Sequence, residues 1–270
     1  MLIATALASA APQALPPTPE NADPAMFMVR DGDTTIYIFG TFHALDGKAD
    51  WFNDGVRAAF DTSGELVLET LVPEGPVDPA QPQFSNAARQ RFGRLAVAPS
   101  ASFLATTRLA IDAGKSQGMQ VGNGADMVLR RAAELAGKDV EGLETLESQL
   151  SMFDRMPPAS PPARLRPGAP VEDDAVPMQS LSKAMADMQT AWKRGDQQVF
   201  VHMLGQLEKS SPDTYRMMFT ERNARWADWI AARMQYPGTV FVAVGAGHLA
   251  GKDSLLVRLA QLGVESARVD

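Results

Sequence analysis

The sequence predicts a mixed α/β domain, and three observations support this fold class. Apolar and β-branched runs typical of strands occur near both ends of the 270-residue chain. Most of the sequence between them has helical periodicity. Two of the strand-like runs also end alike, in "TTIYIFGTFH" (34–43) and "TVFVAVGAGH" (239–248). We therefore expect a central mixed sheet built from two related halves, with a large helical insertion between the first and last strands, which should be neighbours.

The first half of the chain alternates strand and helix signals. "AMFMVRDGDTTIYIFG" predicts a hairpin with a turn at Asp31-Gly32. "DWFNDGVRAAFDTSG" predicts a helix that stops at Gly64, and "ELVLET" predicts a short buried strand. Residues 71–101 are expected to form loops with one short helix near "SNAARQRFGRL". Two amphipathic helices, "SASFLATTRLAIDAGKSQG" and "GADMVLRRAAELAG", follow.

The second half is dominated by helices. "DVEGLET" predicts a strand, and "LESQLSMFDRM" predicts a helix. Residues 157–177 form a Pro-rich loop, because proline at that density cannot sustain a helix. Residues 178–235 are expected to be almost entirely helical. A strand "TVFVAVG", a helix "SLLVRLAQLG" and a terminal strand "VESARV" complete the pattern.

The N-terminal residues differ in composition from the rest. Residues 1–25 are small and apolar and then Pro-rich, and Ala8-Ser9-Ala10 fits a signal-peptidase cleavage pattern, although no positive n-region precedes it. We interpret this stretch as a signal remnant, which predicts a periplasmic or secreted protein; a disordered arm on a cytoplasmic protein is the alternative. Residues 26–270 are expected to form a single domain. No apolar run is long enough to predict a transmembrane segment.

Composition excludes several classes of function. The net charge of −7 argues against nucleic acid as a partner, because no basic stripe offsets it. The absence of cysteine excludes disulfides, thiolate metal sites and a cysteine nucleophile. Neither a phosphate-binding loop motif nor the G-x-S-x-G motif of serine hydrolases is present. A peptide or small-molecule substrate remains the expected partner.

His43 and His248 are the first candidate site residues. Each lies three residues after a Gly at the end of a predicted strand, in a chain with only three histidines. Ligands of open α/β sheets bind at the carboxyl ends of strands, and imidazole suits both base catalysis and metal binding. The alternative is that each is a capping or core residue.

Glu69 and Glu144 are the second pair of candidates. Both occur in "LET" at the end of a short apolar strand, where a carboxylate is unusual unless it is paired, coordinating or solvated. With the histidines they predict either an oxygen–nitrogen metal site or a metal-free acid/base set. A solvated strand end is the alternative for each.

The segment "ERNARWADWI" supplies the third group. Arg222 is a candidate to bind a substrate carboxylate or an oxyanion. The alternative is a surface ion pair between Glu221 and Arg225 beside a core Trp226.

Taken in order, the motifs resemble the TraB/GumN family, which includes TIKI-type Wnt-inactivating metalloproteases. The matching pieces span residues 36–269 and are "YIFGTFHAL", "ELVLET", "GADMVLRRAAELAGKDVEGLETLESQLSMF", "AWKRGD", "ERNARWADWI" and "VFVAVGAGHLAGKDSLLVRLAQLGVESARV". The Pro-rich segment 157–177 departs from the family pattern, where members more often continue as helix.

The resemblance implies a site and a chemistry. It implies that His43, Glu69 and His248 form a metal-dependent centre, and that Glu144, Arg222 and Asn223 match other recurrent positions. The fold is also similar to that of erythromycin esterases, in which His and Glu activate water without an obligatory metal, and to that of a haem-binding bacterial protein.

The leading hypothesis is therefore a metal-dependent, peptidase-like hydrolase. His43, Glu69 and His248 would hold Mn, Co or Zn; Glu69 or Glu144 would accept the proton of water; Arg222 would stabilise the oxyanion, with Arg222 and Asn223 contacting substrate. The alternatives are a non-catalytic binding protein for haem or a surface polymer, and a metal-free esterase-like hydrolase.

Overall fold

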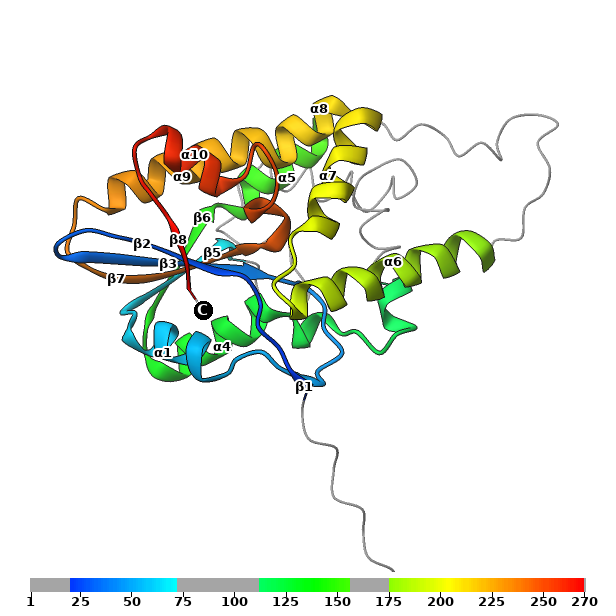
Figure 1. Cartoon of the computed structure of the whole chain (residues 1–270), viewed down its shortest axis with the longest axis horizontal. Helices are drawn as coiled ribbons and strands as arrows, with labels where there is room; N and C mark the ends of the chain where they lie inside the picture. The colour runs from blue at the N-terminus through cyan, green and yellow to red at the C-terminus, as the bar shows by residue number, and fades with distance from the viewer. Residues whose placement is uncertain (1–19, 72–111, 156–174, 270) are drawn as a thin grey trace, which may run out of the picture.

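A six-stranded mixed sheet lies at the centre of the computed structural model, which describes residues 20–71, 112–155 and 175–269 (Figure 1). Its strand order is β6-β5-β7-β3-β2-β8. The strands are β2 (Met26–Arg30), β3 (Thr34–Thr41), β5 (Glu65–Thr70), β6 (Asp139–Glu144), β7 (Gly238–Gly245) and β8 (Ala267–Val269). A separate two-stranded parallel sheet joins β1 (Glu20–Asn21) to β4 (Ala49–Asp50).

The two strands that end alike are direct neighbours. β3 and β7 pair in parallel, with Thr41 opposite Gly245, and β5 pairs in parallel with the other edge of β7. β6 extends this parallel group, whereas β2 runs antiparallel to β3 as the second arm of the predicted hairpin. The predicted mixed α/β fold and the pairing of the early and late strands are both confirmed. As a result, the carboxyl ends of four strands meet at one edge of the sheet.

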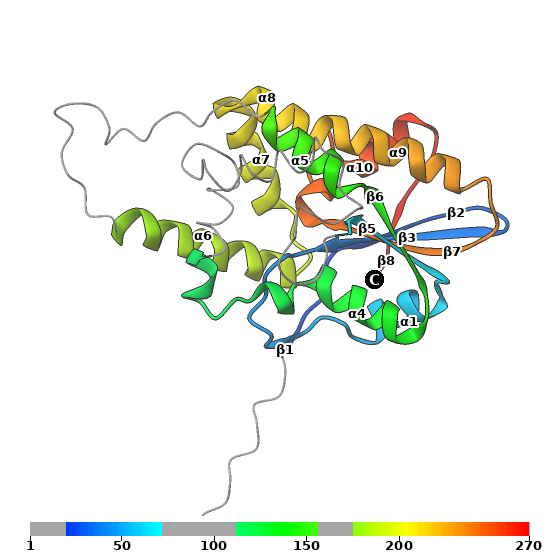
Figure 2. The same ribbon diagram turned by 180° about the vertical axis from the view of Figure 1, so that it is seen from behind.

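Helices cover both faces of the sheet (Figures 1 and 2). α1 and α4 lie on one face, α9 and α10 lie on the other, and α6 and α7 lie beyond the carboxyl ends of β3 and β7. The α-helices are α1 (Asp54–Thr62), α4 (Ala125–Ala136), α5 (Leu146–Asp154), α6 (Ala175–Lys193), α7 (Gln198–Ser210), α8 (Pro212–Tyr215), α9 (Glu221–Arg233) and α10 (Leu255–Gln261). The described residues also form the short helical segments η1 (Val121–Asn123), the π-helical η3 (Arg216–Thr220) and η4 (Ala246–Leu249).

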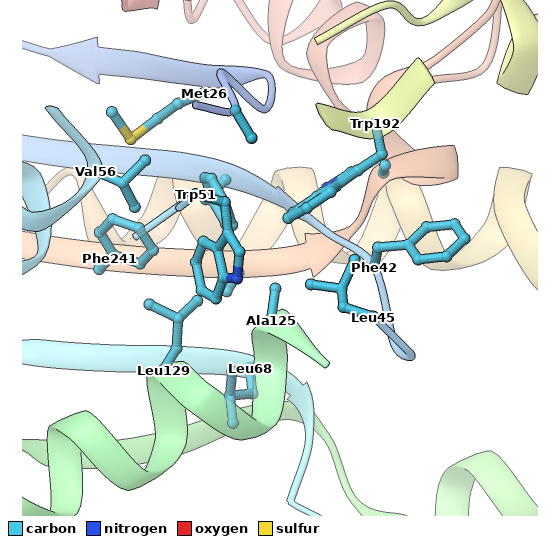
Figure 3. Close-up of a cluster of buried hydrophobic side chains, with 14 of the residues drawn as sticks. Met26, Phe42, Leu45, Trp51, Val56, Leu68, Ala125, Leu129, Trp192 and Phe241 are labelled. Carbon is cyan, nitrogen blue, oxygen red and sulfur yellow. The ribbon is translucent and has the colours of Figure 1, made fainter. Parts of the chain in front are cut away.

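Alternation along β3 divides the core into two layers, because successive side chains of a strand point to opposite faces. Ile36 and Ile38 pack with Trp226 and Ile230 beneath α9. Phe39 belongs to the opposite layer, a cluster that includes Trp51, Val56, Leu129, Trp192 and Phe241 (Figure 3).

Trp192 fastens α6 to the carboxyl end of β3. Its ring is buried against Phe39 and Phe42, and its indole Nε1 donates a hydrogen bond to the Gly40 carbonyl at 2.7 Å. A single buried aromatic residue therefore fixes the helical insertion against the strand that leads into His43.

Local signals explain the helix ends that the sequence predicted. The Asn53 side chain caps α1 by accepting from the Val56 N–H, and Gly137 ends α4 with φ of 66°, a conformation that favours glycine. One boundary was wrong: α6 begins at Ala175, so the last residues of the predicted loop 157–177 are helical. Pro177 is tolerated there because backbone N–H groups in the first turn of a helix have no carbonyl partner within the helix, so a missing N–H costs no hydrogen bond.

Other predictions lie partly or wholly outside the described residues. These are the helix near residues 85–95, most of the helix at 100–118, loop residues 157–174 and residues 1–19. Residues 20–25, which were assigned to the N-terminal arm, take part in the fold: β1 pairs with β4, and Ala22 and Ala25 are buried. None of the helices in the described ranges combines the length and apolarity that a membrane crossing requires.

Candidate functional site

The candidate residues lie at the shared carboxyl edge of the four parallel strands. His43 follows β3 by two residues, Glu69 is the next-to-last residue of β5, and Glu144 ends β6. His248 lies in η4, which directly follows β7. The parallel pairing explains why four residues far apart in sequence occupy one edge.

Three of these side chains converge on Gly245. The position that a Cβ would take on Gly245 is 3.0 Å from Glu69 Oε1, 3.4 Å from His43 Nε2 and 3.8 Å from His248 Cδ2. The two imidazoles of the repeated G-x-x-H motif therefore point toward a common space, which exists because residue 245 has no side chain.

Arg222 organises the buried side of this cluster. Its side chain is 2% exposed; Nη2 donates to Glu69 Oε2 at 2.8 Å and Nη1 donates to His248 Nε2 at 3.2 Å. Nε donates to both oxygens of Glu144 at 3.1 and 3.0 Å. The guanidinium also lies 4.5 Å from the Trp226 ring centroid. The Met218 carbonyl, in the π-helix η3 directly before α9, accepts a hydrogen bond from Nη1. Glu144 therefore anchors Arg222 and is itself buried.

Asn223 fixes the protonation of His248. The Asn223 side-chain Nδ2 donates to the Asp253 carbonyl at 2.8 Å, which leaves Oδ1 to accept a hydrogen bond from His248 Nδ1 at 2.7 Å. His248 Nε2 must accept from Arg222, because a guanidinium can only donate. Burial, together with Arg222 and His43, lowers the pKa of His248 to about 3 against the opposing charge of Glu69. His248 is therefore neutral near pH 7.

His43 has a different environment. Its side chain is 62% exposed, and Nδ1 is 3.2 Å from Asp126 Oδ1 in α4. Neighbouring protein atoms oppose protonation, but the charge and hydrogen bond of Asp126, helped by Glu69, raise the pKa of His43 to about 9. The ring thus has a carboxylate partner at Nδ1 and presents Nε2 to the space beside Gly245.

Glu69 stays ionised in this arrangement. Burial alone would raise its pKa, but Arg222, the two histidines and the Gly245 N–H hold the pKa of Glu69 well below its usual range. The carboxylate is 13% exposed, so one side of it remains accessible.

A large apolar cavity opens beside the cluster. Its volume is about 410 Å³, and His43, Glu69, Arg222 and His248 form one wall. Most of the remaining wall is apolar and comes from α6, α7 and η3. A smaller pocket of about 130 Å³ also has His43 and Glu69 in its wall and is lined by Thr41, Thr70, Asp126 and Gln149. The cluster therefore borders both pockets.

The predicted metal ligands have suitable donor atoms but unsuitable positions. Imidazole and carboxylate are ligands for Mn, Co and Zn. Among the described residues, however, no three His, Cys, Asp or Glu side chains are spaced to hold a metal ion. Arg222 explains this, because its Nη1 uses the Nε2 lone pair of His248 and its positive charge lies beside Glu69. The arrangement does not fit a three-ligand metal centre, and the metal assignment stays a prediction.

Sequence reasoning missed Asp126. The sequence "GAD" contained a signal for this contact, the glycine at its start. Gly124 is the N-cap of α4, and a Cβ there would collide with the His43 carbonyl, so the close approach of α4 to the end of β3 requires glycine. The Ala125 N–H donates to the Phe42 carbonyl at 3.0 Å and completes this contact. The alternative interpretation of the segment "ERNARWADWI" is half right: Trp226 is buried, but Arg225 bonds Glu144 at 3.0 Å and Glu221 lies 3.5 Å from Arg216.

A comparison with protein families identifies the family of the chain. A model of the TraB/PrgY/gumN family matches residues 25–91 and 80–268. The chain belongs to the TraB/PrgY/gumN family. The match includes all four strands that carry the cluster, as well as Asp126 and Arg222. Searches of curated proteins and of solved structures each found no match. Membership in the TraB/PrgY/gumN family does not by itself establish a reaction.

Proposed function

We propose that this TraB/PrgY/gumN family member is a hydrolase that cleaves an ester or amide bond beside Gly245. The observation that carries the proposal is the convergence of His43 Nε2 and Glu69 Oε1 at the wall of an apolar cavity. A titratable base and an ionised carboxylate placed together in a cavity form a plausible centre for activating water.

His43 acts as the base in this proposal. The neutral form of His43 predominates only above about pH 9, and in that form Nε2 takes a proton from water as the water oxygen attacks the carbonyl carbon of the substrate. The resulting imidazolium is stabilised by Asp126 and Glu69, the groups that raise its pKa. The imidazolium then returns the proton to the leaving oxygen or nitrogen as the C–O or C–N bond breaks, releasing an acid and an alcohol or amine and restoring neutral His43.

The buried residues position this machinery. Glu69 orients the water with the oxygen that also accepts the Gly245 N–H, and Arg222 holds the carboxylate in place. Asn223 keeps His248 in a single tautomer. The proposed roles of Arg222 as an oxyanion donor and of Arg222 and Asn223 as substrate contacts stay predictions, because their donors are used by protein groups in the structure.

A metal-dependent version of the same hydrolase needs a rearrangement. A cation held by His43, Glu69 and His248 would have to displace Arg222 from His248. The two versions differ in one measurement: activity that survives exhaustive chelation supports the metal-free reaction, and activity restored only by Mn, Co or Zn supports the metal-dependent one.

The proposal is tested with a library of esters and peptides. The variants His43→Ala and His248→Ala should each lose most of the kcat/KM of the wild type. The matched control is His202→Ala, because His202 is exposed on α7 and bonds Gln206 within the same helix. Equal activity in wild type, His43→Ala and His248→Ala would refute the proposal.

Haem binding is the second candidate, and the cavity itself favours it. The exposed His43 lies in the wall of an apolar cavity and would be the residue that binds the haem iron, whereas His248 Nε2 is already bonded to Arg222. Haem titration tests this function. A Soret shift that is lost in His43→Ala supports it, and no shift in the wild type excludes it.

We further propose that the protein is periplasmic or secreted, from the signal-like residues 1–25. N-terminal sequencing of the protein purified from its natural host tests this proposal. Cleavage after Ala10 supports export, and an uncut chain in the cytoplasmic fraction contradicts it.

A further inference from the structure

The cavity beside the cluster has an unusual wall. Excluding the cluster residues, its lining is rich in methionine and phenylalanine: Met185, Met188, Met203, Met218, Phe200 and Phe219. Three of these methionines, on α6 and α7, are only partly buried, so part of each residue remains accessible. Flexible methionine side chains adapt to apolar ligands of varied shape.

This wall suits a hydrocarbon chain better than a peptide. A peptide carries an N–H and a C=O group at every residue, and burying them without partners costs free energy. Beyond the cluster itself, the lining residues of the cavity are nearly all apolar. A saturated chain makes no such demand, and the volume of about 410 Å³ lies within the range of roughly 300–1,000 Å³ that is usual for small-ligand pockets.

The smaller pocket, which shares His43 and Glu69 with the cavity, has a larger share of polar residues in its lining. Thr41 Oγ1 and Thr70 Oγ1 are buried and have no hydrogen-bond partner in the structure. Both threonines line this pocket together with Asp126 and Gln149. Buried hydroxyl groups are nearly always satisfied, so two unpartnered ones in a single pocket indicate a polar guest.

We infer that the substrate is an ester or amide of an apolar acyl chain with a small hydroxylated leaving group. The acyl chain would occupy the methionine-lined cavity, the leaving group would bond Thr41 and Thr70, and the carbonyl would lie beside Gly245 between them. This inference rests on the proposed hydrolase function for the position of the cleaved bond. The binding of the chain can be measured without any reaction.

The first experiment measures binding by calorimetry with 2-hexanone, 2-octanone, 2-decanone and 2-dodecanone, which have a carbonyl but no leaving group. Each added methylene that is buried should tighten Kd by about three- to fourfold until the cavity is full. Met203→Gln should weaken binding of 2-decanone by at least about tenfold, whereas the apolar Met203→Leu should stay within about threefold of the wild type. Val201→Gln, on the exposed face of the same helix, is the surface control.

The second experiment compares glyceryl and propyl esters of decanoic acid. The wild type should favour the glyceryl ester in kcat/KM, and Thr70→Val, at a residue that lines only the smaller pocket, should reduce that preference without changing the Kd of 2-decanone. If Thr70→Val preserves the preference, the smaller pocket does not bind the leaving group, and that part of the inference is overturned.

The outcomes separate the two proposals. Chain-length-dependent binding without hydrolysis of any ester or amide supports the acyl-chain site and refutes the hydrolase. Hydrolysis with ketone binding that is independent of chain length supports the hydrolase and overturns the acyl-chain inference.

Discussion

The pairing of His43 with Asp126 predicts how the reaction should depend on pH. Asp126→Asn keeps the size of the side chain and an oxygen that can accept from Nδ1, but removes the negative charge 3.2 Å from the ring. His43 would lose the first of the two carboxylates that raise its pKa. The variant therefore tests electrostatics with little change in packing.

The magnitude follows from the exposure of the pair. The side chains of His43 and Asp126 are 62% and 28% exposed, and charge pairs in such positions couple by about 0.2–1 kcal/mol. One pH unit of pKa corresponds to about 1.36 kcal/mol, so the pKa of His43 should fall from about 9 by roughly 0.15–0.7 of a pH unit. If His43 is the base, the pH at which kcat/KM is half-maximal should fall equally.

The His43–Asp126 pair also makes a small contribution to the stability of the fold, and the direction of its pH dependence follows from the raised pKa of His43. The pKa of His43 is higher in the folded protein than the value of 6.5 in an unfolded chain, so protonation stabilises the fold fully below about pH 6.5. That contribution is lost as the pH rises through about 9. The stability difference between the wild type and Asp126→Asn should therefore shrink at high pH.

Proton NMR can measure the titration directly, because the chain has only three histidines and His43→Ala identifies the relevant signal. Glu134→Gln is the control, since Glu134 lies on the same helix but pairs with Arg130. If the His43 titration midpoint is the same in Asp126→Asn and the wild type, Asp126 does not set the pKa. If the midpoint moves but the kinetic profile does not, His43 is not the base.

Three further predictions concern the buried part of the cluster. Arg222→Met should reduce the free energy of unfolding by about 3–5 kcal/mol in urea titrations, because the buried carboxylates of Glu69 and Glu144 lose their shared partner. Arg225→Ala is the control: this side chain is 55% exposed, and its loss should cost less than about 1 kcal/mol. Equal losses of stability in the two variants would contradict this assignment. Gly245→Ala should greatly reduce kcat/KM while the fold remains, because its Cβ would lie 3.0 Å from the carboxylate beneath it. Gly205→Ala on α7 meets open space and should be neutral or stabilising, so similar activity in both alanine variants would refute the crowding argument. The pKa of His248 is lowered to about 3 in the folded protein, so the unfolded chain takes up a proton first and stability should decrease as the pH falls from about 6.5 toward 3. His248→Gln should weaken this acid dependence of stability. An unchanged dependence of the melting temperature on pH, measured by circular dichroism, would contradict the prediction.

Local patterns determined most of the secondary structure and the candidate residues. Apolar and β-branched runs, with the Asp31-Gly32 turn, predicted β2, β3, β5 and β7, and the glycine at 137 marked the end of α4. These features depend on neighbours within a few residues, so sequence alone contains them. The repeated G-x-x-H and "LET" endings placed four candidates at strand ends for the same reason.

Only the tertiary structure decided what those candidates do. The Asp126 contact with His43 spans 83 positions, and the Arg222 contact with Glu69 spans 153, so no local pattern encodes either pair. Parallel pairing of β3, β5 and β7 brings the histidines and Glu69 around Gly245, and Arg222 then takes the lone pair that a metal would need. The sequence by itself determined which residues end the strands. The packing of α4 and α9 against those ends determined the charge, the tautomer and the accessibility of the site residues. These properties could not be predicted locally, because they arise from groups that meet only in the folded chain.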